Sequence, residues 1–248
     1  MPKLSEIEIG PKKILLYGEP GCGKTAFALT LGEKALYADF DQGLQTGTTL
    51  QDKFTKDRGN VEVVTFYNTN PNLVESYSRF KQFVIKLCNE CRAGNVKQKV
   101  LVIDSLTSMI DASMYTILSN SGHLEKPPTI SEYGLRHTDI LNVFRILKAT
   151  NIHVIYLAHV FVYMEGGLNQ AEQLKRRIFI QGAKLEPNIT TYFDEIWYMQ
   201  SKEGGSKRSI KTLNTGALLA RTRSNLPKEV DTDDISLVEL FEKLNVEL

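Results

Sequence analysis

The octet GEPGCGKT at residues 18–25 constrains this chain more than any other stretch. It contains the complete pattern G-x-x-x-x-G-K-[ST]. A short apolar run, 14–17, precedes it, and a stretch rich in helix-forming residues, 26–34, follows it. The order of strand, glycine-rich loop and helix lets backbone N–H groups and the helix dipole converge on a polyphosphate. The octet therefore predicts a nucleotide-binding loop rather than an ordinary glycine turn.

Each residue of this loop has an expected task. Lys24 would reach the β- and γ-phosphates of ATP, and Thr25 would place its hydroxyl on Mg²⁺. The sequence thus predicts ATP and Mg²⁺ as ligands, although nothing in it marks an adenine pocket. The residues expected around the nucleotide are Gly18, Glu19, Pro20, Gly21, Cys22, Gly23, Lys24, Thr25 and Ala26.

Strands and helices alternate through the first 160 residues, which is typical of parallel βαβ units. The segment 119–134 contains a Pro-Pro pair and no period, so we expect a loop there. The expected strands are 13–17, 35–39, 61–66, 98–104 and 152–158, and the expected helices are 24–33, 74–92, 105–119 and 132–149.

The pattern changes after residue 160. Residues 161–190 show no clean period, whereas 194–200 and 208–214 alternate as the strands of an antiparallel hairpin do. Residues 233–248 have the pattern of an amphipathic helix. Because the chain shows neither a linker nor a repeat, the sequence predicts a single α/β domain over residues 1–248. Its sheet would be mostly parallel and flanked by helices, with an antiparallel hairpin near the C-terminus.

Acidic side chains follow two of the expected strands. Asp104 ends the run VLVID and would emerge beside the glycine-rich loop, where open α/β sheets bind their ligands. There it could complete the Mg²⁺ shell with Thr25, and we favour this role over that of a helix N-cap. Asp39 and Asp41 follow the second strand. Either could activate a water molecule, and two acids after a strand are equally common as turn formers.

His159 comes directly after the strand expected at 152–158, at the same edge of the sheet. Its imidazole could donate a hydrogen bond to a γ-phosphate, although a lone histidine is more often structural. Cys88 and Cys91 form a C-x-x-C pair late in a helix, at the end whose dipole does not favour a thiolate. No pair of histidines completes a zinc site, so we expect the two cysteines to pack in the core.

Composition limits the partners. The net charge of +1 gives no overall field that would attract nucleic acid, so any such contact must be local. No apolar run approaches the ~20 residues of a membrane span, and the N-terminus lacks the apolar core of a signal peptide. Three cysteines in 248 residues argue for a reducing compartment. We expect no membrane contact and a cytoplasmic location.

Five stretches together resemble the RecA superfamily of P-loop ATPases: GEPGCGKT, YADFDQGL, VLVIDSLTSM, YLAHV and LLARTRSNLP. More narrowly, the chain is similar to the small phage-encoded RecA-like proteins associated with single-strand annealing and recombination, and the resemblance covers nearly all of it. The resemblance implies a RecA-like core that hydrolyses ATP slowly, is stimulated by DNA and assembles into a ring or filament. It also implies the host bacterial cytoplasm as location and a single-strand-binding protein as a further partner.

The resemblance also implies roles for single residues. Asp41 would orient the attacking water with support from Asp39; the family usually has glutamate there, and the shorter side chain fits a slow rate. His159 takes the position of a polar residue, usually glutamine, that couples the γ-phosphate to a DNA loop. Arg221 and Arg223 match basic residues that enter the site of the neighbouring subunit and stabilise the charge of phosphoryl transfer.

The resemblance places DNA-binding loops at 119–134 and 160–184. Cations interleaved with aromatic residues suit single-stranded nucleic acid, through phosphate contact and base stacking. A solvated basic loop is the plainer alternative. In the second loop the cations are Lys175, Arg176, Arg177 and Lys184, and the aromatic residues are Phe161, Tyr163 and Phe179.

Three functions remain open at this point. The first is an oligomeric RecA-like ATPase that binds single-stranded DNA and promotes annealing or recombination. The second is a P-loop kinase for a nucleotide or small metabolite, with the basic run 175–177 as a lid. The third is a non-catalytic ATP switch. The set of motifs favours the first.

Overall fold

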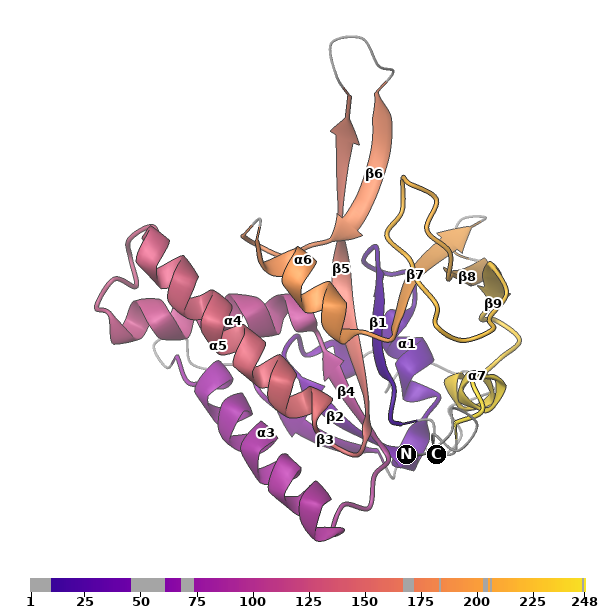
Figure 1. Cartoon of the computed structure of the whole chain (residues 1–248), viewed down its shortest axis with the longest axis horizontal. Helices are drawn as coiled ribbons and strands as arrows, with labels where there is room; N and C mark the ends of the chain where they lie inside the picture. The colour runs from indigo at the N-terminus through magenta and orange to yellow at the C-terminus, as the bar shows by residue number, and fades with distance from the viewer. Residues whose placement is uncertain are drawn as a thin grey trace, which may run out of the picture.

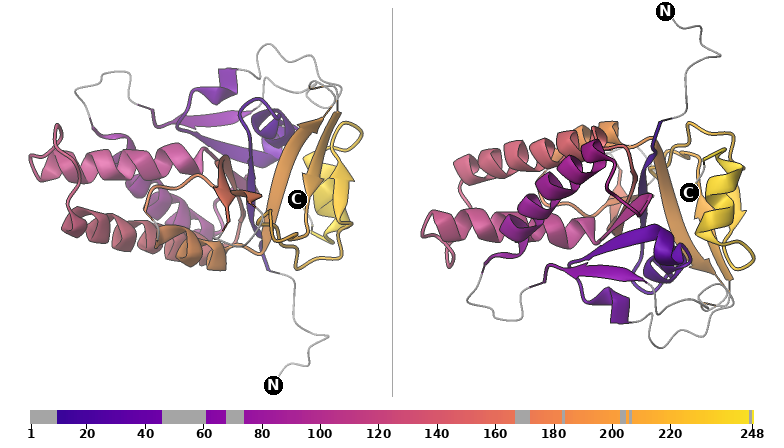
Figure 2. Two further views of the ribbon diagram at one scale, coloured as in Figure 1. Left: turned by 90° about the horizontal axis from the view of Figure 1, so that it is seen from above. Right: turned by 90° about the horizontal axis from the view of Figure 1, so that it is seen from below.

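The computed structural model describes residues 10–45, 61–67, 74–166, 172–182, 184–202, 205, 207–246 and 248. In this part a twisted sheet lies between two layers of helices (Figures 1 and 2). None of the described helices has an apolar stretch of the length that a membrane crossing needs. One layer contains α3 (Ser76–Ala93), α4 (Leu106–Asn120), α5 (Ile130–Lys148) and the short α6 (Leu185–Ile189), and the other contains α1 (Lys24–Leu29) and α7 (Leu237–Lys243).

The strands follow the order β3-β2-β4-β5-β1-β7-β8-β9, and a further strand, β6, pairs with β5. Strands β3 to β7 of this order are parallel, whereas β8 and β9 are antiparallel to their neighbours. The predicted RecA-like α/β fold, with a mostly parallel sheet and antiparallel strands near the C-terminus, is confirmed. The strands are β1 (Lys13–Gly18), β2 (Ala35–Asp39), β3 (Glu62–Thr65), β4 (Val100–Asp104), β5 (His153–Glu165), β6 (Gln173–Ile178), β7 (Glu195–Lys202), β8 (Lys207–Lys211) and β9 (Glu229–Asp231).

The central strands read as continuous apolar runs because both faces of the sheet are covered. In β1, Leu15 and Tyr17 join the core on the side of α3, α4 and α5, whereas Ile14 and Leu16 join the core on the side of α1 and α7. All four side chains are fully buried. The sheet therefore supports two cores, and its carboxyl edge is left for polar groups.

Two expected boundaries were wrong, for local reasons. The helix expected at 24–33 ends at Leu29, since Gly32 adopts φ +57° and a 3-10 turn (Gly32–Lys34) follows. The loop expected at 119–134 is shorter, because α4 continues to Asn120 and Thr129 starts α5. Thr129 and Glu132 form a reciprocal capping box there, which satisfies two free N–H groups of the first turn.

The segment expected to lack structure after residue 160 is instead a β-hairpin. Strand β5 continues past the edge of the sheet to Glu165 and pairs antiparallel with β6, from Val160 opposite Ile178 to Glu165 opposite Gln173. Figure 1 shows this hairpin standing out from the carboxyl edge of the sheet. Since its two strands supply each other's hydrogen bonds, the chain can extend there without a hydrophobic core beneath it.

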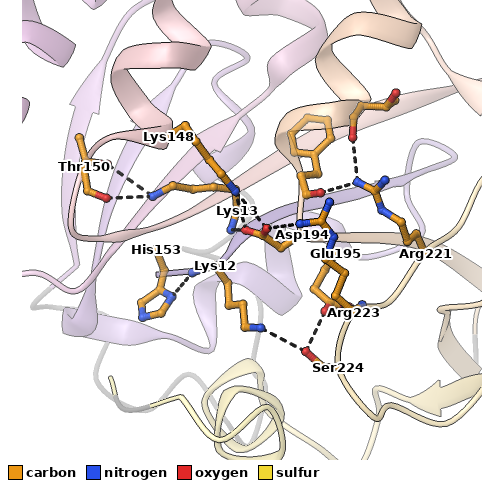
Figure 3. A network of polar contacts seen from close by, with 12 residues as sticks. Lys12, Lys13, Lys148, Thr150, His153, Asp194, Glu195, Arg221, Arg223 and Ser224 are labelled. Carbon is orange, nitrogen blue, oxygen red and sulfur yellow. Dashed lines mark hydrogen bonds and ion pairs between the residues drawn. The ribbon is translucent and has the colours of Figure 1, made fainter. Parts of the chain in front are cut away.

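A polar network fixes the opposite, amino-terminal edge of the sheet (Figure 3). The ammonium of Lys13 is buried and donates to the carbonyl of Ile152 at 2.5 Å and to that of Thr150 at 3.3 Å. The backbone N–H of Lys12 donates to Nδ1 of His153 at 2.9 Å. Burial lowers the pKa of His153 to about 4, and the nearby charges of Lys13, Lys12 and Lys99 act in the same direction. The ring is therefore a neutral acceptor at pH 7.

His153 should make the stability of the fold depend on pH. The unfolded chain takes up this proton near pH 6.5 and the folded chain near pH 4, so stability rises with pH between these values and falls on acidification. From this residue alone we expect a loss of about 2 kcal/mol in unfolding free energy between pH 7.5 and pH 5. His153→Asn keeps an acceptor for Lys12 and removes the titration, so urea unfolding should give a shallower pH dependence. His137→Asn, outside this network, is the reference, and equal slopes for all three proteins would contradict the expectation.

Candidate functional site

The glycine-rich loop joins β1 to α1 in the expected way. Gly21 and Gly23 adopt φ values of +77° and +99°, which side-chain-bearing residues rarely adopt. A Cβ at Gly18 would lie 2.2 Å from the carbonyl oxygen of Met199, so only glycine fits at the end of β1. Glu19, Pro20 and Gly21 are exposed at the rim of the loop, whereas Cys22 and Ala26 are buried beneath it.

Lys24 turns back into the loop that precedes it. Its ammonium donates to the carbonyls of Gly18 and Glu19, each at 2.9 Å, and lies 3.6 Å from Sγ of Cys22. The side chain is buried. A cation held by neutral carbonyls is available to the oxygens of a phosphate, which would be its stronger partners.

Thr25 and Asp104 meet beside this loop. The hydroxyl of Thr25 donates to Oδ2 of Asp104 at 2.7 Å. A Cβ at Gly43 would lie only 3.4 Å from the same oxygen, so the glycine keeps this space open. Ser105 is the N-cap of α4, accepting from the N–H of Ser108 at 3.2 Å, and Asp104 is therefore not the cap. The peptide bond between Asp104 and Ser105 is cis.

This pair fits Mg²⁺ as it is bound beside nucleotides. Mg²⁺ prefers oxygen ligands and takes few of them from the protein, the rest being phosphate oxygens and water. One hydroxyl and one carboxylate meet that requirement. Among the described residues, no three His, Cys, Asp or Glu side chains converge as a site that could hold a metal ion by themselves.

Burial, together with neighbouring carboxylates, raises the pKa of two acids at this edge. The pKa of Asp104 is about 6, first because the group is buried and then because of the charges of Asp41 and Asp39. Burial also raises the pKa of Asp39, whose Oδ1 accepts from the N–H of Asp41 at 3.1 Å. The ligand-free site thus holds negative charge at a cost that a nearby cation would reduce.

Asp41 remains ionised in this surrounding. Burial opposes its charge, but the nearby donor groups of His159, Ser108 and Ser105 outweigh that effect and lower its pKa. Its Oδ2 lies 3.7 Å from Nε2 of His159. An ionised carboxylate held by several donors can orient a water molecule and accept a proton from it. The structure therefore brings Asp41 and His159, which were predicted in separate roles, close together.

His159 is the link between this edge and the hairpin. It lies opposite Gly18 in the register of β1 and β5. Its backbone N–H donates to Oγ1 of Thr107 at 3.1 Å, and that hydroxyl donates to the carbonyl of Phe179 at 3.3 Å. The N–H of Phe179 in turn donates to the carbonyl of His159 at 2.8 Å. Both ends of the hairpin are therefore tied to the residues that follow Asp104.

One face of the hairpin combines aromatic rings with cations. Phe161 is opposite Arg177, and Tyr163 is opposite Lys175. The ring centroid of Phe161 lies 5.5 Å from that of Tyr163 and 6.1 Å from that of Phe179, with the planes near parallel. The guanidinium of Arg177 lies 5.8 Å from the centre of the Tyr163 ring. This face, defined by Phe161, Tyr163, Lys175, Arg177 and Phe179, is called the aromatic–basic face below.

The four cations predicted to contact nucleic acid do not lie together. Lys175 and Arg177 belong to the aromatic–basic face, although the ammonium of Lys175 also donates to the carbonyl of Gly216 at 2.7 Å. Arg176 points to the other face of β6 and lies near the phenol of Tyr198. Lys184 is exposed at the start of α6, below the hairpin.

Arg221 and Arg223 lie at the amino-terminal edge of the sheet, away from the glycine-rich loop of their own chain (Figure 3). The guanidinium of Arg221 donates to the carbonyls of Thr190, at 2.9 Å, and Phe193. Arg223 is half exposed and lies 3.1 Å from Oδ1 of Asp194. From this edge neither arginine serves its own nucleotide site, so any role in hydrolysis has to be played on another subunit.

Sequence reasoning missed Arg208. This residue of β8 packs on the glycine-rich loop, since a Cβ at Gly23 would lie 2.9 Å from its Cδ and 3.0 Å from its Nε. No motif marks Arg208, because its position depends on the pairing of β8 with β7. Thr107 and Ser108 were missed as well, although their place directly after Asp104 is a signal that could have found them.

The C-x-x-C pair shows no sign of redox chemistry. Cys88 is buried, Cys91 is half-buried, and both are free thiols. Burial and the neighbouring Cys88 raise the pKa of Cys91, which disfavours the reactive thiolate. Their position in α3 agrees with the expected packing role.

A family model described as an AAA domain matches residues 10–224. The chain belongs to the AAA domain family. Together with the sheet order and the loop geometry, this match confirms the predicted RecA-superfamily P-loop ATPase core, and such AAA domains bind nucleotide, typically with Mg²⁺. No curated protein matches the chain. Among solved structures, the crystal structure of the RadB recombinase is similar, with 18% identity, a TM-score of 0.47, and 90% of this chain and 87% of that chain covered.

Binding and hydrolysis should separate at Asp41. Asp41→Asn keeps the hydrogen-bonding shape but removes the proton acceptor, so we expect ATP affinity within about threefold of the original and a fall in kcat of about 10²–10⁴-fold. Lys24→Ala removes the phosphate contact and should abolish ATP binding at the concentrations where the parent saturates. Nucleotide titration and steady-state phosphate release measure the two effects. Loss of binding in Asp41→Asn would make Asp41 a structural residue.

Proposed function

We propose that this AAA domain hydrolyses ATP with Mg²⁺, binds single-stranded DNA on its β5–β6 hairpin, and acts as an oligomer in annealing or recombination. The observation that carries the proposal is the continuity of β5. One unbroken strand places His159 beside Asp41 and then presents Phe161 and Tyr163 on the hairpin. Any change at the nucleotide edge therefore acts on the strand that would hold DNA.

For hydrolysis, the loop N–H groups and Lys24 hold the phosphates, and Asp41 orients the attacking water and accepts its proton. Thr25 and Asp104 would hold Mg²⁺, which supplies charge neutralisation at the phosphates. Ser105, Ser108 and His159 keep the Asp41 carboxylate in place. The shorter Asp in place of Glu agrees with slow turnover.

For DNA, the aromatic–basic face offers two kinds of contact. Stacked rings with an exposed edge accept bases of any sequence, and the cations neutralise phosphates. Phe161 is 47% exposed and Phe179 is 39% exposed. Because the two rings lie together, they form an exposed apolar patch, and such patches commonly mark binding sites. The whole chain has a net charge of only +1, so a nucleic acid would be attracted by this local cluster of cations and not by the overall charge.

For assembly, the half-exposed Arg223 is the better placed of the two arginines. It lies at the edge opposite to the glycine-rich loop, so a head-to-tail arrangement would bring it to the nucleotide of the next subunit. Arg221 is engaged by carbonyls of its own chain and would position the segment that carries Arg223. Whether the assembly is a ring or a filament, and whether a single-strand-binding protein joins it, stay predictions, as do the phage origin and the cytoplasmic location.

The kinase alternative has less support. A lid would need its cations on one side of a mobile segment, whereas Lys175, Arg176 and Arg177 alternate between the two faces of a paired strand. The switch alternative would bind ATP without turnover and without a response to DNA. Asp41 and the donor groups around it are in place for hydrolysis, which favours the ATPase.

The first test is the steady-state ATPase rate with and without single-stranded DNA over a series of salt concentrations. We expect stimulation that fades as salt rises, because phosphate contacts are screened. Arg177→Ala should reduce the salt slope of DNA binding by about one, and Tyr163→Ala should weaken binding by about 1–3 kcal/mol. Lys97→Ala, an exposed cation in the loop before β4, is the control. A rate that DNA does not change would remove the DNA-binding part of the proposal.

The trans role of Arg223 can be tested by mixing. Arg223→Ala should lower kcat by at least about tenfold with unchanged ATP affinity, because its charge would act only during phosphoryl transfer. An inactive Lys24→Ala subunit still carries Arg223, so mixing the two variants should restore part of the activity. Arg145→Ala, on the exposed face of α5, serves as the control. If the mixture is no more active than its components, Arg223 does not act across an interface.

A further inference from the structure

A cavity of about 400 Å³ lies next to Asp41, and neither ATP nor the hairpin accounts for it. It is bounded by α4, by the start of α3 and by the residues that follow β2 and β3. Its volume is in the range of about 300–1,000 Å³ that small-molecule sites occupy. It is therefore large enough for a ligand of its own.

Aromatic rings form much of its wall. Phe40 and Phe66 are buried, with ring centroids 5.3 Å apart and planes 24° from parallel. Tyr67 and Tyr115 also line the cavity, and Tyr115 is 57% exposed. A phenol that is exposed at the mouth of a cavity can stack on a flat ligand without being extracted from a core.

Polar groups also lie among these rings. Ser108 and Asp111 are three residues apart on α4, so they share a face of that helix, and both line the cavity. The hydroxyl of Ser108 accepts from that of Ser105 at 3.2 Å and lies close enough to Asp41 to help lower its pKa. The Asp111 carboxyl has no hydrogen bond to any described residue. Burial raises its pKa; the charge of Arg136 lowers it, that of Asp41 raises it and that of His159 lowers it.

We propose that this cavity binds a nucleobase, with the ring stacked against Tyr115 and a ring or amino N–H donated to Asp111, and that Ser108 transmits its occupancy to Asp41. The effect on turnover rests on the ATPase proposed above. The binding of the base to the cavity does not depend on that proposal.

Other ligands fit less well. An apolar side chain would leave the Asp111 carboxyl without a hydrogen-bond partner in a partly dry site, which costs free energy. A phosphate or carboxylate would meet the negative charges of Asp41 and Asp111. A simple amine would pair with Asp111 but would leave the aromatic wall unused. A heterocyclic base has both a flat face and N–H donors at its edge, so it satisfies both parts of the cavity.

The base could belong to a bound strand or to a free nucleoside, since both present the same chemistry. If it belongs to the strand, ATP turnover has to respond to bases and not only to phosphates. A strand without bases, with the same number of phosphates, would also lose stacking on the aromatic–basic face, so it is compared at concentrations that saturate the hairpin through its phosphates. Under those conditions it would bind and fail to stimulate.

The test uses the full chain and three probes: 2-aminopurine riboside, an oligonucleotide with 2-aminopurine at one position, and an abasic oligonucleotide of equal length. Fluorescence of the first two reports binding, and phosphate release reports turnover with all three. Tyr115→Ala and Asp111→Asn should each weaken binding of the fluorescent base at least tenfold. Leu135→Ala, with a side chain equally exposed at 56% but outside the cavity, should not. Two variants of different chemistry, each checked for an unchanged melting curve, protect the test against misfolding.

The outcomes separate this inference from the proposed function. Binding of the riboside alone, sensitive to both variants, supports a free nucleoside as the ligand, and binding of the labelled strand with the same sensitivity supports a strand base. If neither variant weakens either probe, the cavity is not a base site. If the abasic strand stimulates turnover as well as the intact strand, coupling through Ser108 is wrong while DNA-stimulated hydrolysis stands. If no strand binds, the DNA proposal fails, and binding of the riboside alone then shows whether the cavity is a base site.

Discussion

The position of β1 between β5 and β7 determines where every group of the site lies. Both pairings are parallel, and they set Gly18 level with His159 on one side and Met199 on the other. On the same edge, the pairing of β2 with β4 sets Asp39 level with Asp104. Because a Cβ at Gly18 would collide with the Met199 carbonyl, the close approach of β1 and β7 requires glycine at the point where the loop begins. One register therefore explains both the glycine and the meeting of loop, acids and histidine.

The same edge concentrates negative charge. Asp39 and Asp41 act on Asp104, and the ammonium near Asp104 is that of Lys24, which the loop carbonyls already hold. Burial and mutual repulsion raise the pKa of Asp104 to about 6, so the ionised form that a divalent cation needs is costly in the free protein. Functional sites commonly keep such unfavourable charge because the ligand relieves it. Here the donor groups around Asp41 lower the pKa of that carboxyl alone, so Asp41 stays ionised whether or not Asp39 and Asp104 are ionised.

The sequence predicted what depends on neighbours in the chain and missed what depends on distant pairing. The glycine-rich loop and Asp104 could be located because each motif carries its own strand and turn. The hairpin was missed because both faces of β5 and β6 mix apolar and charged residues, so neither strand shows the alternation of a half-buried strand. The internal hydrogen bonds of Arg221 and the contact of Arg208 with Gly23 likewise arise from segments far apart in sequence.

Asp41 lies between two polar side chains, His159 and Ser108, and these lead to different surfaces. His159 leads through Thr107 and Phe179 to the aromatic–basic face, and Ser108 leads to the aromatic cavity. In the proposed function the aromatic–basic face binds phosphates and stacked bases, whereas the aromatic cavity binds the edge of one base. Salt screens the phosphate contacts far more than it weakens a stacked, partly buried base, so the two inputs differ in their salt dependence. Coupling between sites is reciprocal in binding free energy. If a bound strand raises the affinity of the site for ATP, ATP must raise the affinity for the strand by the same factor, and hydrolysis would then weaken the hold on the strand.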